Sequence, residues 1–380
     1  MKFGLMKFDY TTNLGNEIQS IAARRFLPKI DYFIDHEKLN MFKNDEKVRM
    51  IMNGWYLDCL ESWPPSPDID PLLISMHFNT SVNDTKKIIS TKESRDFFSS
   101  YGPVGCRDIS TLNLLNELDI EAYYSGDLTL TLNGKCEKND YKYVVVNSFI
   151  SKEIIEFLKT KMNINMDIYE IQQESTWSFD QKYLDKMPYY YSLNSFYNYE
   201  EKFFMAENIL KIYENAHCVI TDRVHCALPC LALKTPVLFF NSANYARERL
   251  EGLNKLFFTS TFQEYCENYD IFDIENPPKN PKNYLKIRYK LLNKTKKFTG
   301  HLNDCYDTIL NKELNSYKQT ALLSKTTYET RNYMQNIFKL SNKYEQKLSE
   351  INQEKNMIIT KQKQEIIKLK EIISQLQEKT

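Results

Sequence analysis

Short apolar runs alternate with stretches in which apolar residues recur every three or four positions. The run at Lys2–Phe8 predicts a strand, and the following stretch predicts a helix in which Ile18, Ile21 and Ala22 share one face. Strands that alternate with helices in this way are typical of a parallel sheet covered by helices. The later elements expected in this part of the chain are strands at Val48–Met52, Leu72–His77 and Ala122–Tyr124 and a helix over Ile109–Leu118.

A polar, turn-like segment at Asn133–Asp140 separates these elements from a second half that restarts the alternation. We therefore expect two α/β domains with parallel sheets, one at residues 1–138 and one at residues 139–300. The elements predicted in the second domain are strands at Tyr143–Val146, Ile168–Ile171, Tyr189–Tyr191, Cys218–Thr221 and Pro236–Phe240 and helices at Lys152–Lys159, Glu200–Tyr213 and Cys226–Leu233.

The remaining residues have a different pattern. We expect a helical connection at residues 301–330 and a coiled-coil tail at residues 331–380. From Ile337 to Leu376 apolar residues recur mostly at steps of three and four among Lys, Glu and Gln, as in a coiled-coil seam with interruptions. Such a helix would serve homo-oligomerisation or the docking of a partner. A solvated single helix is the alternative, because the seam is imperfect.

Composition limits the class of protein and the kinds of partner. The 380 residues are 42% hydrophobic and 26% charged, values that allow a sizeable core. The 50 basic and 50 acidic side chains leave no net field for a nucleic acid or an anionic membrane surface, so a bound anion needs a local site.

The cysteines and the apolar stretches indicate a compartment. None of the eight cysteines forms a CxxC pair, and Cys226 and Cys230 are expected to be small buried side chains in a reducing environment. Lys7 and Asp9 interrupt any signal peptide, and the most apolar stretch, Cys226–Phe240, is too short to span a bilayer. We expect a cytoplasmic protein without a transmembrane segment, which could bind peripherally to the inner face of the membrane.

The segment from Thr221 to Cys226 holds the most informative chemistry. An apolar strand ends at Thr221 and an apolar helix begins near Cys226, so the turn lies at the carboxyl edge of a parallel sheet, where ligands bind. On an extended turn Arg223 and His225 face the same way. Together with the helix start, they predict a site for a carboxylate or phosphate with a proton shuttle beside it. The alternative is that both side chains make structural hydrogen bonds.

Three other places carry candidate side chains. Arg107 precedes Asp108, the expected N-cap of the helix at Ile109, and its alternative role is a salt bridge to a carboxylate. The Asn13–Asn16 loop follows the first strand, and His77 ends another. The chain has no glycine fingerprint for a dinucleotide or a nucleoside triphosphate, and no pair of His or carboxylate residues has metal-ligand spacing. Neither a cofactor nor a metal is therefore expected.

Taken in order, these stretches resemble the polysaccharide pyruvyl transferase family over residues 11–245. The family fold that this implies is similar to that of GT-B glycosyltransferases, with two Rossmann-like domains facing across a cleft. The implied reaction moves the pyruvyl group of phosphoenolpyruvate onto two hydroxyls of a sugar as a cyclic ketal, in bacterial capsular, exopolysaccharide or cell-wall glycan synthesis. The resemblance rests on Asn13-Leu-Gly-Asn16, Gly105-Cys-Arg-Asp108 with Ser110, Ser125-Gly-Asp127-Leu128, and above all Thr221-Asp-Arg-Val-His225 before Thr235-Pro236-Val237.

The resemblance also implies roles for individual residues. His225 is implied as the general acid/base, because an imidazole with an ordinary pKa of about 6.5 suits a proton shuttle. Arg223 and Arg107, one from each domain, are implied as ligands of phosphoenolpyruvate, whose carboxylate and phosphate need cations from more than one direction. Phosphoenolpyruvate is then the donor substrate and no cofactor is needed, while the acceptor is a sugar or a lipid-linked glycan. The acceptor-side candidates are Asn13, Asn16 and His77.

Two other functions stay open. A glycosyltransferase of the same fold would use a nucleotide-sugar donor, although the sequence shows no pocket for a base and ribose. A non-catalytic scaffold would bind glycan with the two domains and recruit partners through the tail. Retention of Arg107, Arg223 and His225 together favours an enzyme over the scaffold. The acceptor sugar, the hydroxyls bridged and the stereochemistry of the ketal do not follow from the sequence.

Overall fold

The computed structural model describes residues 1–9, 11–57, 60–79, 83–134, 141–162, 166–173, 199–241 and 250–306, together with Lys347, Lys355 and Gln362. Residues 1–315 form one compact unit and residues 316–380 a second. Apart from those last three residues, the predicted coiled coil lies outside the described part of the chain and stays a prediction. The same holds for the strand expected at Tyr189–Tyr191.

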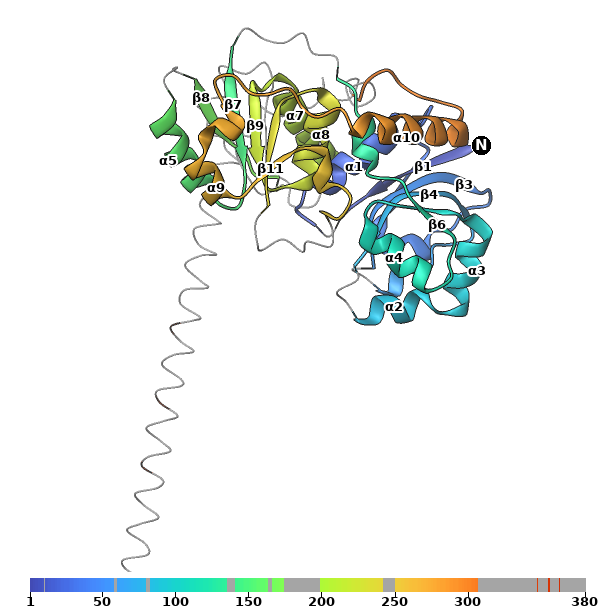
Figure 1. The fold of residues 1–380 in the computed structure, drawn as a ribbon. Helices are drawn as coiled ribbons and strands as arrows, with labels where there is room; N and C mark the ends of the chain where they lie inside the picture. Colours follow the sequence, from blue (N-terminus) through green and yellow to red (C-terminus); the bar gives the residue numbers. More distant parts are fainter. Residues whose placement is uncertain are drawn as a thin grey trace, which may run out of the picture. The chain divides into compact units, whose positions relative to one another are not determined.

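The first half of the 1–315 unit is a six-stranded parallel sheet of order β2-β1-β3-β4-β5-β6 (Figure 1). Its strands are β1 (Lys2–Lys7), β2 (Tyr32–Asp35), β3 (Val48–Tyr56), β4 (Ile69–Phe78), β5 (Val104–Cys106) and β6 (Ala122–Tyr124). The helices of this half are α1 (Gly15–Arg24), α2 (Asn83–Ile89), α3 (Lys92–Tyr101) and α4 (Ile109–Glu117), with 3₁₀ helices η1 (His36–Met41), η2 (Leu60–Ser62) and η3 (Leu128–Thr131).

The second half is a five-stranded parallel sheet of order β11-β10-β9-β7-β8. Its strands are β7 (Tyr143–Asn147), β8 (Asp167–Glu170), β9 (Cys218–Thr221), β10 (Val237–Phe240) and β11 (Phe258–Ser260). The remaining helices are α5 (Ser151–Lys161), α7 (Tyr199–Asn215), α8 (Val224–Leu233), α9 (Phe262–Glu267) and α10 (Tyr284–Thr299), with 3₁₀ helices η5 (Asn254–Leu256) and η6 (Tyr269–Phe272).

The predicted alternation of parallel strands and helices is confirmed in both halves. One difference is β5, a strand that the apolar pattern did not predict because it is short and contains Gly105. Gly105 has to be a glycine in this strand, because a Cβ there would lie 2.8 Å from the Tyr123 hydroxyl oxygen and 3.1 Å from the Ile74 Cα. A second difference is β3, which continues to Tyr56 instead of ending at Met52.

The two faces of the first sheet pack into separate cores, as the period of two along a strand requires. Leu5, Ile51 and Ile74 pack with α1 on one face, whereas Met50 and Leu73 pack on the other with α3 and α4. The α1 core continues without a break into the second half. Its members there include buried side chains of the second sheet and of α7 and α8, among them Val145, Val219, Ile209, Leu210, Leu228 and Leu231.

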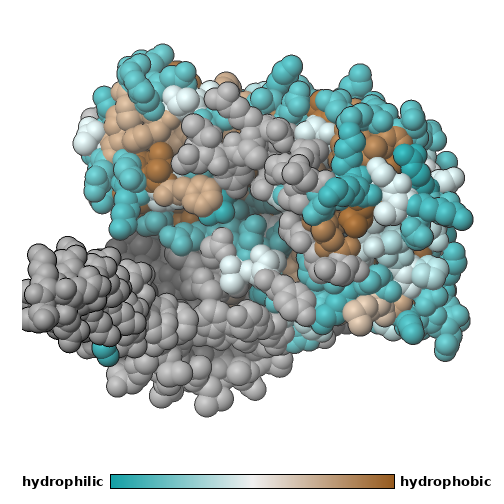
Figure 2. Space-filling view, turned by 90° about the horizontal axis from the view of Figure 1, so that it is seen from below, coloured by the Kyte–Doolittle hydropathy of each residue, from teal (hydrophilic) through white to brown (hydrophobic). Residues whose placement is uncertain are grey.

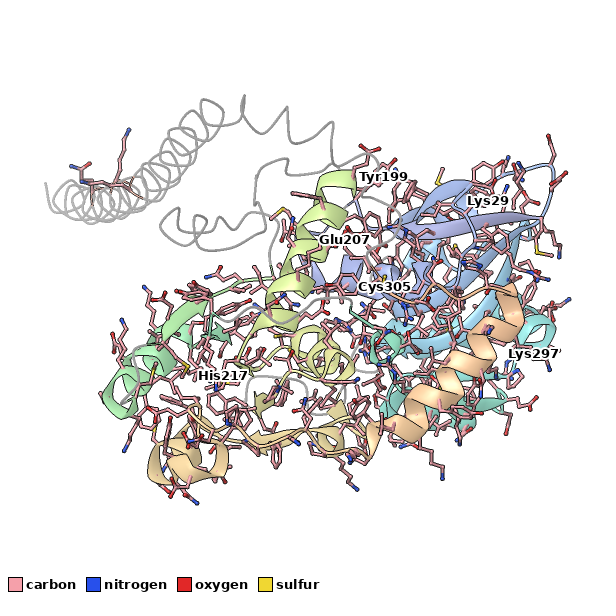
Figure 3. All side chains as sticks on the ribbon, turned by 90° about the horizontal axis from the view of Figure 1, so that it is seen from above. Lys29, Tyr199, Glu207, His217, Lys297 and Cys305 are labelled. Carbon is pink, nitrogen blue, oxygen red and sulfur yellow. The ribbon has the colours of Figure 1, made fainter. Side chains whose placement is uncertain are left out.

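Polar contacts also join the two halves. Helix α7 packs against α1 through two buried ion pairs, Lys202–Glu17 at 2.7 Å and Arg24–Glu207 at 3.4 Å. Figure 3 labels Tyr199 and Glu207 along α7. Helix α10 contacts both halves, because the Arg288 guanidinium donates to three backbone oxygens. These belong to Leu130 in η3 at 2.7 Å, Leu132 just after η3 at 2.8 Å and Ala232 in α8 at 3.3 Å.

The domain boundaries expected at residues 138 and 330 lie among residues that the structure does not describe. Residues 135–140, around the expected boundary at residue 138, lie outside the described chain, and the four proposed domain ranges stay predictions. Among the described residues, no helix combines the length and the apolar character that a bilayer crossing requires.

Candidate active site

The turn between β9 and α8 brings Arg223 and His225 to the carboxyl edge of the second sheet. Arg223 has extended backbone angles (φ −99°, ψ 123°), and α8 begins one residue later, at Val224. Thr221 holds the turn, because its hydroxyl accepts from the Arg223 N–H at 2.9 Å and donates to the Asn147 oxygen at 2.7 Å. Arg223 therefore lies on an extended turn, as expected. The helix begins earlier than expected, so His225 lies in its first turn, where its backbone angles are non-helical (φ −81°, ψ 15°).

Asp222, between these residues, has a structural role. Its Oδ2 accepts hydrogen bonds from the Ser148 hydroxyl at 2.7 Å and from the Phe149 N–H at 3.0 Å. These bonds fix the β7–α5 loop against the turn. The Arg223 guanidinium lies 3.9 Å from the centre of the Phe149 ring, a distance at which a cation and an aromatic face attract each other. Burial raises the pKa of Asp222, although Ser148 and Phe149 oppose that shift.

A carboxylate from the first half holds the imidazole of His225. Asp127 follows β6, is 1% exposed, and places its Oδ2 3.3 Å from Nε2 of His225. Its Oδ1 accepts from the N–H and the hydroxyl of Thr129 at 2.8 and 2.6 Å. Burial alone would raise the pKa of Asp127, but His225, Arg107 and Thr129 outweigh it and lower the pKa. An ionised carboxylate only accepts hydrogen bonds, so Nε2 of His225 carries the proton in this contact.

The loop between β1 and α1 faces the other ring nitrogen of His225. Asn13 shapes this loop, because its Oδ1 accepts from the Gly15 N–H at 3.0 Å. A Cβ on Gly15 would lie 3.0 Å from both His225 Nδ1 and Asn13 Oδ1, so only glycine leaves the imidazole room here. Gln173, after β8, links the loop to the turn: its backbone oxygen accepts from the Leu14 N–H at 2.8 Å and its side chain donates to the His225 oxygen at 2.7 Å.

Arg107 follows β5 and is 4% exposed. Its N–H donates to the Met76 oxygen at 2.8 Å, and its Nε lies 3.4 Å from Oδ2 of Asp108. Asp108 caps α4 as expected, accepting from the Thr111 N–H at 2.9 Å. The same carboxylate binds Nδ1 of His77 at 2.6 Å. Burial alone would raise the pKa of Asp108, but its bond to His77 and the charges of His77 and Arg107 hold the pKa at about 2.

These segments enclose one small cavity of about 90 Å³ between the two sheets. Most of its lining side chains are polar or charged. Seen from below, hydrophilic side chains are visible within a hollow near the middle of the molecule (Figure 2). The lining residues are Asn13, Asn16, Gln19, Trp55, Arg107, Gln173, Arg223, Val224 and His225.

The structure brings together five of the six residues singled out from the sequence. Asn13, Asn16, Arg107, Arg223 and His225 all line the cavity, whereas His77 does not. His77 is 1% exposed and lies behind Trp55, with ring centres 4.6 Å apart, because β4 continues through it into Phe78. Its expected position facing the crevice is therefore corrected to a buried one beside Asp108.

Sequence reasoning missed Asp127, Gln173, Gln19 and Trp55 as parts of the site. Asp127 stood in one of the quoted motifs but received no role. Asp127 and Gln173 come within three residues of the ends of predicted strands, so the rule that ligands bind at carboxyl edges could have found them. Trp55 was missed because β3 was expected to end at Met52. No sequence pattern pointed to a role for Gln19.

Chemically, two guanidinium groups and an imidazole reach one confined, polar space from both halves of the unit. Such an arrangement can bind a small dianion and exchange a proton with it. Within the described ranges, no group of three or more His, Cys, Asp or Glu side chains is placed to hold a metal ion.

Comparison with solved structures finds low similarity to several proteins. UDP-GlcNAc 2-epimerase of Methanocaldococcus jannaschii, solved with UDP-GlcNAc and UDP, is 12% identical, with 78% of this chain and 99% of that chain covered at a TM-score of 0.39. MnaA of S. aureus, solved with UDP, is 11% identical, with 79% and 97% covered at a TM-score of 0.39. A functionally uncharacterised protein of Klebsiella pneumoniae is 11% identical, with 67% and 88% covered at a TM-score of 0.38.

No curated protein sequence matches the chain. The family model for polysaccharide pyruvyl transferase, in contrast, matches residues 13–244. The matched range begins at Asn13 and contains Arg107, Gln173, Arg223 and His225, which line the cavity, and Asp127, which contacts His225. The chain belongs to the polysaccharide pyruvyl transferase family.

Proposed function

We propose that this transferase moves the pyruvyl group of phosphoenolpyruvate onto two hydroxyls of a glycan sugar, forming a cyclic ketal and releasing phosphate. The observation that carries the proposal is the meeting of Arg107 and Arg223, from different sheets, in one cavity with His225. Family membership supports pyruvyl transfer to a polysaccharide, and the cavity supports the donor.

The cavity favours a small acid as the donor. Phosphoenolpyruvate carries a carboxylate and a phosphate on a three-carbon skeleton, and guanidinium groups bind both kinds of anion through paired hydrogen bonds. The volume of about 90 Å³ is well below that of pockets that hold larger ligands, which span roughly 300–1,000 Å³. A nucleotide sugar, the donor of the alternative glycosyltransferase function, is therefore a poorer match for this cavity.

His225 supplies the proton transfers. Asp127 holds Nε2, so Nδ1, beside Gly15 and Asn13, is the nitrogen that exchanges protons with substrate. Protonation of the methylene carbon makes an oxocarbenium-like centre at C2, and one sugar hydroxyl adds to it and loses its proton. The C2–O bond to phosphate then breaks, phosphate leaves, and the second hydroxyl closes the ring with loss of its proton. The balance is phosphoenolpyruvate plus diol giving ketal plus phosphate, so no oxidant or reductant is needed.

The proposal also covers the fold around the site and the binding of the acceptor. The two parallel sheets correspond to the two domains of a GT-B arrangement, with the glycan entering between them. Asn13 and Asn16 stay acceptor-side candidates because their amides line the cavity. The scheme uses no cofactor or metal, and it fits a cytoplasmic enzyme acting on a free or lipid-linked sugar.

A phosphate-release assay tests the function. Phosphoenolpyruvate is offered with a panel of hexosides, and the product is checked for a gain in mass equal to pyruvic acid less one water. We expect His225→Ala to lower turnover by roughly 10²–10⁴-fold, the usual contribution of a positioned acid/base, while phosphoenolpyruvate still binds. Near-normal turnover in His225→Ala would refute the catalytic role. Sugar transfer from a nucleotide donor by the same chain would favour the alternative enzyme.

A further inference from the structure

Basic side chains are concentrated in one part of the chain although the net charge is zero. From Asn276 to Asn303 the sequence has seven lysines and one arginine and no Asp or Glu. The rest of the chain carries 42 basic and 50 acidic side chains. The net charge of the whole chain is therefore zero although the segment Asn276–Asn303 is positively charged, and α10 forms the centre of this segment.

Helix α10 has one buried face and one exposed face. Tyr284, Leu291, Thr295 and Thr299 are buried, and Arg288, on the same side, clamps the helix to η3 and α8. The opposite face is exposed at positions three, four and seven apart, so it forms a continuous stripe along the helix. The exposed stripe consists of Leu285, Lys286, Tyr289, Lys290, Asn293, Lys296 and Lys297.

The charges of the stripe are available to a partner. Lys294 is used internally, with its ammonium 3.8 Å from the centre of the Tyr123 ring. In contrast, no carboxylate in the described part of the chain forms an ion pair with the four lysines of the stripe. Figure 3, seen from above, shows α10 at the surface and labels Lys297 near its end.

Two apolar side chains lie among these lysines. Leu285 is 45% exposed and Tyr289 is 67% exposed, and they are two of the five large apolar side chains exposed in the described residues. They lie four residues apart on one face of the helix, and each is followed directly by a lysine, Lys286 or Lys290. A helix with lysines around exposed Leu and Tyr is suited to the boundary between lipid headgroups and acyl chains.

We propose that the exposed stripe of α10 docks on the surface of an anionic phospholipid bilayer. The lysines attract the headgroups, while Leu285 and Tyr289 insert at the boundary below them. An anionic polysaccharide would also attract lysines, but it would have no use for the two apolar side chains. The stripe contributes no side chain to the cavity, so this surface does not depend on the proposed reaction.

Sedimentation with sucrose-loaded vesicles tests the proposal on the full-length chain. Vesicles of phosphatidylcholine are compared with an equimolar mixture of phosphatidylcholine and phosphatidylglycerol, at physiological and at high salt. We expect binding to the mixed vesicles that weakens with salt, and the triple variant Lys286→Ala, Lys290→Ala, Lys296→Ala should partition on the order of 100-fold less. A matched triple variant, Lys142→Ala, Lys152→Ala, Lys159→Ala, removes exposed lysines of the second half and should bind like the parent.

Substitution of Leu285 and Tyr289 distinguishes binding to a lipid bilayer from binding to a polyanion. Leu285→Ser with Tyr289→Ser should weaken vesicle binding but leave binding to heparin unchanged. Three results would overturn the proposal: equal binding to neutral vesicles, no loss in the α10 lysine variant, or no effect of the apolar substitutions on vesicle binding. Circular dichroism and thermal unfolding establish that each variant is folded, and its soluble phosphate-release activity should equal that of the parent.

Discussion

Asp127 fixes the orientation of the His225 ring through its contact with Nε2. Its carboxylate is fixed by Thr129 and lies 3.3 Å from Nε2, so the ring is oriented with Nδ1 toward the β1–α1 loop. Asp127 does not line the cavity. In the proposed reaction we expect it to act through His225, as a positioning residue in the sense that the aspartate of a hydrolase triad is one.

We expect Asp127→Asn to lower kcat by roughly 10²-fold, because an amide no longer fixes which nitrogen carries the proton. Affinity for phosphoenolpyruvate should change little, since both guanidinium groups remain. Steady-state phosphate release and direct donor titration together separate these effects. A loss of donor affinity as large as the loss of kcat would contradict the positioning role.

The close approach of Gly15 to His225 leads to a second prediction for a single residue. A Cβ there would lie 3.0 Å from His225 Nδ1 and from Asn13 Oδ1, so Gly15→Ala should displace the imidazole and lower turnover. The control is a double-mutant cycle. In a His225→Ala background Gly15→Ala should have no further effect on turnover, since residues that act through one another are not additive. Additive losses would show that Gly15 acts elsewhere.

At the scale of elements, the segment from β5 to α4 combines a cap, an ion pair and a cavity wall. Asp108 caps α4, binds His77 and lies beside Arg107. The cap could be predicted, because Asp before an apolar helix is a recognisable signal. The partnership with His77 could not, because the two residues meet only through the pairing of β4 with β5, and the apolar pattern did not predict β5.

The pKa of Asp108 gives a prediction for stability. The folded-state pKa of about 2 lies below the ordinary value of 3.8, so the unfolded chain binds this proton first. The contribution is thus present above about pH 4 and is lost as pH falls toward about 2, and it amounts to about 2 kcal/mol. Urea unfolding should show the difference in free energy of unfolding between parent and Asp108→Asn shrinking across this window. A difference independent of pH would contradict the assignment.

At the scale of the molecule, the sequence patterns predicted two α/β halves and most of their strands. They did not predict how the halves are joined. The contacts that close the cavity, such as Leu14 with Gln173 and Asp127 with His225, connect residues far apart in the chain, and no periodicity records such pairs. The sequence pattern placed Arg223 in an anion site with His225, but its convergence with Arg107 came only from the family resemblance.

We predict that the C-terminal residues 331–380 control the oligomeric state. The sequence of residues 337–376 predicts a helix with an apolar seam that association would bury, and the candidate site lies in a separate unit of the chain. Truncation after Thr330 should therefore lower the oligomeric state while phosphoenolpyruvate binding persists. Multi-angle light scattering measures the first and calorimetric titration the second. A full-length protein that is monomeric at micromolar concentration would rule out this role.

Calorimetric titration of phosphoenolpyruvate tests the central claim most directly, because it needs no knowledge of the acceptor. We expect the parent to bind phosphoenolpyruvate in preference to nucleotide sugars. Arg107→Ala and Arg223→Ala should each lose about 1.5–3 kcal/mol of donor affinity, and Arg223→Lys should recover only part of it, because an ammonium cannot present a planar fork. Arg95→Ala, which removes an arginine outside the cavity, should bind like the parent. If both cavity variants bound phosphoenolpyruvate as tightly as the parent, the donor site would be elsewhere and the account would be wrong.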